Sequence, residues 1–99
     1  MHKENLIIVK IDLSRNQINE VALLAHANSI RQNIVRMIAR NGQGYLQQGL
    51  GAADLFTYLY FAEALIDPLN PNWAERDRIF LSTAHNSAVF HATLAERGF

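Results

Sequence analysis

The sequence contains no cysteine in its 99 residues and only two prolines. Without cysteine, the chain has neither a disulfide framework nor thiolate chemistry. It also lacks an excess of charge of either sign, because nine basic residues balance nine acidic ones. Proteins that bind nucleic acid or anionic membranes usually carry surplus positive charge. The composition therefore argues against both kinds of partner.

Long hydrophobic runs are scarce near the N-terminus. The apolar stretch Leu6–Val9 is brief and is followed by Lys10 and Asp12. This segment is too short and too charged for a signal peptide or a membrane span. Because 49% of the residues are hydrophobic, one small domain with its own core remains possible. We expect a cytoplasmic chain that does not enter a membrane.

Apolar spacing predicts three helices. The first covers about residues 16–40, where apolar side chains recur at helical intervals before an Asn41-Gly42 stop. A glycine-rich connection over 42–51 follows. The second helix, about 52–66, is apolar nearly all round and should be buried on several sides. The third covers about residues 86–97.

Two short strands are also predicted. Residues 6–13 are β-branched and alternating, so residues 1–15 read as an N-terminal arm or strand. Ile79–Leu81 is a short apolar run that leads through a small-residue turn into the third helix. A strand followed by a helix is half of a β-α-β unit, and its parallel partner strand is missing. The fold class is therefore α/β, mostly helical, and we favour a fragment of a larger domain over completion by oligomerisation.

The turn before the third helix carries His85. Turns between a strand end and a helix N-terminus often build anion sites, and an imidazole can donate a hydrogen bond to a phosphate oxygen. Alternatively, His85 caps the helix or hydrogen-bonds within the turn. Taken alone, the pattern favours this structural role. No metal site is expected, because the four histidines are dispersed and no paired carboxylates show ligand spacing.

Several segments, in order from about residue 24 to the end, are similar to known motifs. Taken together they resemble the N-terminal, thiamine-diphosphate-binding portion of the transketolase family, including its Asp-Pro-x-Asn-Pro-x-Trp loop and its Asp-Arg-Phe-x-Leu-Ser-x-Gly-His motif. The matching segments are residues 27–38, 49–55, 66–73, 77–85 and 94–99.

The resemblance implies roles for two residues. His85 matches the family histidine that contacts the diphosphate of thiamine diphosphate. Tyr45 stands where a Gly-His-Pro-Gly sequence of the family places a histidine on the substrate side. A tyrosine can hydrogen-bond an oxygen but carries no charge near neutral pH. The resemblance thus assigns His85 to the cofactor and Tyr45 to the substrate.

The same resemblance implies that much of the active site lies elsewhere. The family binds Mg²⁺ through a Gly-Asp-Gly…Asn stretch that has no match here, and its catalytic glutamate belongs to another domain. We therefore expect residues 16–99 to be an incomplete domain without catalytic residues or metal ligands of its own. It would act with the remaining transketolase domains or a partner subunit, in a dimer that transfers a two-carbon ketol unit between sugar phosphates.

An alternative comes from a different functional class. A truncated family member can serve as a non-catalytic interaction module, which would dock its apolar second helix and unpaired strand on a partner or on a second copy. The sequence alone leaves this alternative open.

Overall fold

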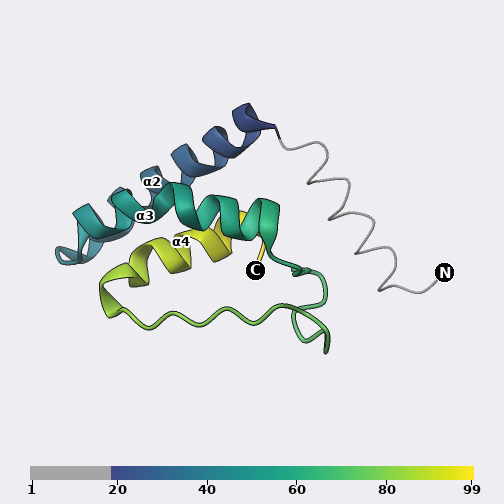
Figure 1. The fold of residues 1–99 in the computed structure, drawn as a ribbon. Helices are drawn as coiled ribbons and strands as arrows, with labels where there is room; N and C mark the ends of the chain where they lie inside the picture. Colours follow the sequence, from purple (N-terminus) through teal and green to yellow (C-terminus); the bar gives the residue numbers. More distant parts are fainter. Residues whose placement is uncertain (1–18) are drawn as a thin grey trace.

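Three helices pack against one another in the computed structural model, which describes residues 19–99 (Figure 1). In chain order the elements are α2 (Glu20–Asn41), α3 (Leu46–Tyr58), the π-helical turn η1 (Leu59–Glu63), the 3₁₀ turn η2 (Ala84–Asn86) and α4 (Ser87–Arg97). The predicted three helices are confirmed within this part of the chain. The predicted arm or strand of residues 1–15 lies outside it.

The helices share one apolar core. Ile30 and Ile34 of α2 are fully buried, as is Val89 of α4. The other buried members of this core come from α3, from η1 and the residues that follow it, and from α4: Ala53, Phe56, Tyr60, Ala64, Ile66 and Ala92. From Ala27 onward the helical spacing of apolar residues in the sequence is the spacing of the buried face, whereas Val21 and Leu24, which share that spacing, are exposed. No helix within residues 19–99 is long and apolar enough to cross a membrane.

Helix α2 is bounded by side-chain and backbone caps. The Asn19 Oδ1 accepts hydrogen bonds from the backbone N–H groups of Val21 and Ala22, at 2.9 and 3.3 Å. At the other end Gly42 has φ 74°, a conformation that glycine adopts easily, and its N–H donates to the Ile38 carbonyl. The helix therefore starts a few residues later than predicted and stops where the Asn41-Gly42 pair indicated.

Helix α3 departs from its prediction in two ways. It begins at Leu46, so the second half of the expected glycine-rich connection is helical. Gly49 is buried against α2, where an added Cβ would lie 3.3 Å from Ile34 Cγ2. This glycine serves close helix packing and does not break the helix. It also ends sooner than predicted, because the α-helix stops at Tyr58 and η1 follows. Burial on several sides holds for residues such as Ala53 and Phe56, whereas Leu55 is 66% exposed.

The end of α3 widens into the π-turn η1. The Ala64 N–H donates to the Leu59 carbonyl at 2.8 Å, five residues back. The Tyr60 carbonyl instead accepts a hydrogen bond from Arg97 Nε at 2.8 Å, and the Ile66 carbonyl accepts one from Arg97 Nη2 at 3.4 Å. One arginine at the end of α4 therefore satisfies backbone groups that the irregular end of α3 leaves open.

The predicted strand at Ile79–Leu81 is wrong. Residues 77–83 run extended past the helices (Figure 1), but within residues 19–99 they pair with no other strand. A run of β-branched and aromatic residues favours extended backbone, whereas a strand also requires a hydrogen-bonded neighbour. The described part of the chain is therefore all-helical, and the α/β character expected from the sequence is not seen in it.

Candidate functional site

The two residues assigned from the family resemblance, Tyr45 and His85, meet at one end of the helix bundle. Tyr45 directly precedes α3, and His85 lies in η2 just before α4. Their ring centroids are 4.4 Å apart with an interplanar angle of 73°, an edge-to-face arrangement that aromatic rings favour. The structure therefore joins two positions that are far apart in the sequence.

The polar atoms of this pair are mostly unengaged. His85 Nδ1 lies 3.5 Å from Thr83 Oγ1, a long hydrogen bond. Within residues 19–99 the His85 ring makes no other hydrogen bond, and Tyr45 is 52% exposed. The His85 Nε2 and the Tyr45 hydroxyl are thus both free to bind a ligand.

Two helix N-termini converge on the same place. Neither α3 nor η2 with α4 has a side-chain cap on its first N–H groups, and α3 contacts η2. Uncapped N–H groups together with the positive end of the helix dipole attract anions. Two such ends beside one histidine make a surface that suits a phosphate or diphosphate group.

A buried polar atom next to His85 also lacks a partner. The Asn86 Oδ1 is inaccessible to solvent and has no hydrogen bond within residues 19–99. Buried polar atoms without partners are uncommon in native structures and often mark places where a ligand or a further chain segment binds. Asn86 Oδ1 is therefore a buried acceptor that residues 19–99 leave without a donor.

A hollow of about 190 Å³ lies beneath Tyr45 and His85. The ends of α2 and α4 line it through Met37, Ile38, Asn41, Ala88 and His91, together with residues 43–45, 84, 85 and 87. Gly44 gives the loop its path into this hollow: its φ is 145° and an added Cβ would lie only 2.8 Å from Ile38 Cγ1. The position of Tyr45 thus depends on a glycine immediately before it.

We predict that Gly44→Ala destabilises the chain by about 1–3 kcal/mol, because alanine strains at positive φ and collides with Ile38. Urea denaturation followed by circular dichroism measures the loss. Gly51→Ala is the matched control, since an added Cβ at that helical glycine meets nothing within 4 Å. The control should be neutral or stabilising by about 0.5–1 kcal/mol, and equal losses in both variants would contradict the strain at Gly44.

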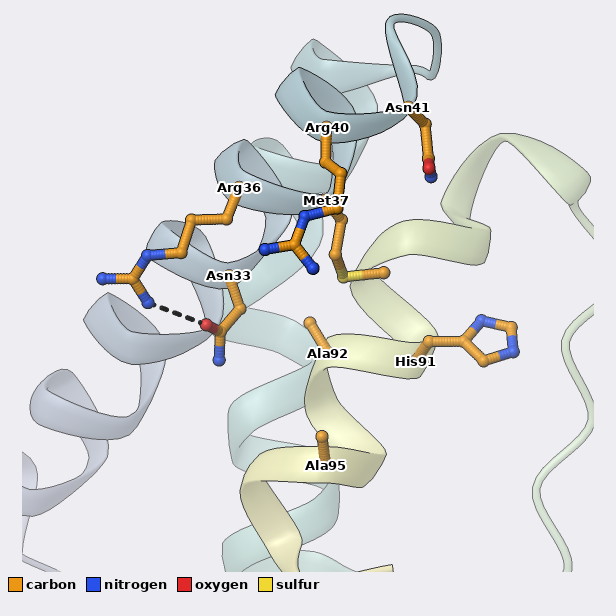
Figure 2. Close-up of a pocket in the computed structure, with 8 residues that line it drawn as sticks. All are labelled: Asn33, Arg36, Met37, Arg40, Asn41, His91, Ala92 and Ala95. Carbon is orange, nitrogen blue, oxygen red and sulfur yellow. Dashed lines mark hydrogen bonds between the residues drawn. The ribbon is translucent and has the colours of Figure 1, made fainter.

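A second, larger groove of about 530 Å³ adjoins this hollow between α2 and α4 (Figure 2). It shares Met37, Asn41 and His91 with the hollow. Arg36 and Arg40 line it, and from the sequence these two residues appeared only as basic residues near a helix C-terminus. Their four-residue spacing was the one signal that they share a face.

Metal ligands are not grouped in the described residues. Within residues 19–99 no three His, Cys, Asp or Glu side chains are placed to hold a metal ion together. Two carboxylates on the helices are paired with basic side chains. Glu96 pairs with His26 at 2.8 Å, and Asp54 pairs with Arg31 at 3.1 Å.

Comparison with known proteins bears on these observations. The family model of the transketolase thiamine diphosphate binding domain matches residues 24–99. The 6-deoxy-6-sulfo-D-fructose transketolase subunit of a Clostridium species is 36% identical over 80 residues, which cover 81% of this chain and 29% of that protein. A putative uncharacterised transketolase family protein of Sinorhizobium fredii is 37% identical over 78 residues, covering 79% and 28%.

A match to a transketolase likewise covers most of this chain but only a small part of the relative. The transketolase of Treponema pallidum is 39% identical over 80 residues, which cover 81% of this chain but only 12% of that protein. The chain thus spans less than a third of the length of each of these relatives. Since the family match extends over most of the sequence and confirms the resemblance found in its motifs, the chain belongs to the transketolase family and corresponds to part of its thiamine diphosphate binding domain.

Proposed function

We propose that this chain is the N-terminal part, or a subunit, of a thiamine diphosphate-dependent transketolase-like enzyme. The enzyme transfers a two-carbon ketol unit between sugar phosphates, and the 99 residues alone are inactive. The observation that carries the proposal is the convergence of two uncapped helix N-termini on His85. When bound, thiamine diphosphate supplies the carbon–carbon bond chemistry, and the protein positions and shields it.

In this proposal His85 holds the diphosphate. Its free Nε2 donates a hydrogen bond to a phosphate oxygen, while Nδ1 stays near Thr83. A hydrogen bond to a negatively charged phosphate oxygen is stronger than one to a neutral acceptor. The backbone N–H groups at the start of η2 add further donors, whereas those of Asn86 and Ser87 already donate to the Thr83 and Ala84 carbonyls.

Tyr45 faces the substrate in the same proposal. Its ring packs edge-on against His85, so its hydroxyl would be able to donate to a sugar oxygen of a substrate bound beside the cofactor. Because the tyrosine hydroxyl is neutral, it can hydrogen-bond a sugar oxygen without adding a charge to the site. The Clostridium relative is named for a sulfonated fructose, and the substrate class proposed for this chain is a ketose with an acidic substituent.

The remaining walls of the site come from other domains or a partner subunit, including the Mg²⁺ ligands and the catalytic glutamate. The extended segment 77–83 is the place where a neighbouring strand joins, since Phe80 within it is 86% exposed. Its inner end is fixed by two hydrogen bonds between Asp77 and the Leu65 backbone, at 2.7 and 2.8 Å. We propose that the enzyme is dimeric and cytoplasmic.

In the assembled enzyme, His85→Ala should weaken thiamine diphosphate binding by about 1.5–3 kcal/mol, the value of a hydrogen bond to a charged group. Isothermal titration calorimetry with the cofactor and Mg²⁺ measures the change. His85→Gln keeps a side-chain donor and should recover part of the loss. Glu75→Ala changes an exposed residue outside this hollow; it is the control and should leave the affinity within about twofold.

An unchanged cofactor affinity in His85→Ala would assign His85 to the turn and remove the main support for the proposal. Ketol transfer by the purified 99-residue chain would contradict its second half. The alternative of a non-catalytic interaction module is favoured by the exposed side chains of Leu55 and Phe80. Sedimentation of the chain separates the two: a well-folded monomer with no tendency to associate argues against the module.

A further inference from the structure

The groove between α2 and α4 has an unusual distribution of charge. Its lining contains two arginines and no carboxylate (Figure 2). The lining residues are Asn33, Arg36, Met37, Arg40, Asn41, His91, Ala92 and Ala95. Positive charge in a concave, partly apolar surface attracts anions and raises their local concentration.

Arg36 and Arg40 stand one helical turn apart, so their charges repel one another. Arg36 Nη1 donates to Asn33 Oδ1 at 3.0 Å, a neutral acceptor. Arg40 makes no hydrogen bond or ion pair with any residue of 19–99. By contrast Arg31, on the same helix, is paired with Asp54 at 3.1 Å. The groove therefore holds two arginine charges that no acid of the described chain balances.

Arg40 does not serve mainly as a cap for α2. Figure 2 shows its guanidinium turned back from the end of the helix, toward Asn33 and over the space beside Met37. A cation that neutralises the helix dipole lies instead against the last carbonyl groups. The orientation places the guanidinium where it can bind a ligand in the groove together with Arg36.

The rest of the groove is apolar and small. The wall that α4 contributes consists of Ala92 and Ala95, and Met37 lies opposite (Figure 2). The His91 ring points away from the arginines, and its Nδ1 lies 2.8 Å from the Ser87 carbonyl. A ligand that fills the groove thus meets charge at one end and aliphatic surface along its body.

We propose that this groove is an oxyanion-binding site for small organic molecules, in which Arg36 and Arg40 hold a phosphate or sulfonate group and Met37, Ala92 and Ala95 contact the carbon chain. Planar guanidinium groups bind such oxyanions through paired N–H donors. A tetrahedral anion between the two arginines also removes their mutual repulsion. The groove adjoins the hollow beneath His85, with which it shares Met37, Asn41 and His91, but Arg36 and Arg40 line the groove alone. Binding in the groove therefore does not depend on the proposed diphosphate position.

Titration of the full chain with n-propyl phosphate, n-propanesulfonate, n-propanol and inorganic phosphate tests the proposal. Amide NMR shifts report where each probe binds. We expect both propyl anions to shift Met37, Ala92 and Ala95 with a dissociation constant of roughly 1 mM, and n-propanol to shift none of them. Comparison of the two anions shows whether phosphate or sulfonate is the preferred group. Inorganic phosphate should bind severalfold more weakly, because it lacks the carbon chain.

Arg40→Gln should weaken both propyl anions at least about tenfold, and Arg36→Gln should do so to a similar extent. Arg40→Lys keeps the charge but loses the fork of donors, so an intermediate loss is expected. Arg78→Gln removes the same charge outside the groove and should change the affinity by less than about twofold. Unchanged circular dichroism in each variant confirms that the fold is intact.

Three outcomes would overturn the proposal. The first is that the Arg40→Gln affinity equals that of the parent chain. The second is that the probes shift Ala84–Asn86 and leave the groove unchanged, which would assign anion binding to the site near His85 alone. The third is that n-propanol binds as well as the anions, which would make the groove merely apolar.

Discussion

Replacing Arg97 with methionine should lower the free energy of unfolding by about 2–5 kcal/mol. The Arg97 guanidinium bonds to the carbonyls of Tyr60 and Ile66, at 2.8 and 3.4 Å. It also lies 5.7 Å from the centre of the Phe61 ring, which is within cation–π range. Methionine fills similar space but leaves both carbonyls without a donor in a partly buried place.

The electrostatics of Arg97 reflect the same burial. Desolvation lowers the pKa of Arg97, and the negative charge of Asp67 opposes that shift. An arginine remains protonated across the whole physiological range. The side chain is therefore a permanent cation that joins the end of α4 to the end of α3, and no change of pH near neutrality should release it.

Urea unfolding of Arg97→Met measures this loss. Arg78→Met is its matched control, because Arg78 is exposed and its hydrogen bonds to the Ala74 and Arg76 carbonyls are long, at 3.3 and 3.4 Å. The control should cost no more than about 0.5 kcal/mol. Similar losses in the two variants would mean that the π-turn does not depend on Arg97.

Replacing Ile34 with alanine should also cost about 2–5 kcal/mol. Ile34 is fully buried in the core that the three helices share. Its side chain packs against Gly49 of α3, where an added Cβ would lie 3.3 Å from Ile34 Cγ2. Alanine would leave a cavity that the closely packed helices cannot fill by small movements.

Val35 supplies the control for this variant. It is the next residue on α2, also aliphatic and branched, but 46% exposed. Val35→Ala should change the unfolding free energy by about 0.5 kcal/mol or less. Comparable denaturation midpoints for Ile34→Ala and Val35→Ala would contradict the burial of Ile34 in the shared core.

The helices could be predicted from the sequence because their cores obey a local rule. Apolar residues such as Ile30 and Ile34 recur at the period of the helix, and Asn41-Gly42 carries a recognised stop signal. The start of α3 could not be predicted in this way. Gly49 belongs to a glycine-rich stretch of the kind that forms linkers. Its place inside a helix is explained by the close packing of Ile34 of α2 against it.

The prediction of a strand at Ile79–Leu81 is wrong for a related reason. Its residue types specify an extended backbone, but pairing depends on a neighbour that no local pattern contains. The contact between Tyr45 and His85 likewise depends on tertiary structure. In the sequence, only the family resemblance links these two residues. The sequence predicts that Arg36 and Arg40 lie near the end of one helix. It does not predict the groove beside them, because the groove depends on the small side chains of α4.

The meeting of Tyr45 and His85 connects binding to folding. The two rings touch only when the start of α3 and the start of α4 are docked together, so a ligand held between them binds the folded chain and not the unfolded one. At a hundredfold excess over its dissociation constant, such a ligand adds about 2.7 kcal/mol to stability by mass action. The cofactor proposed for this site would thus also stabilise the fold, and the folded fraction of the chain would rise with the cofactor concentration.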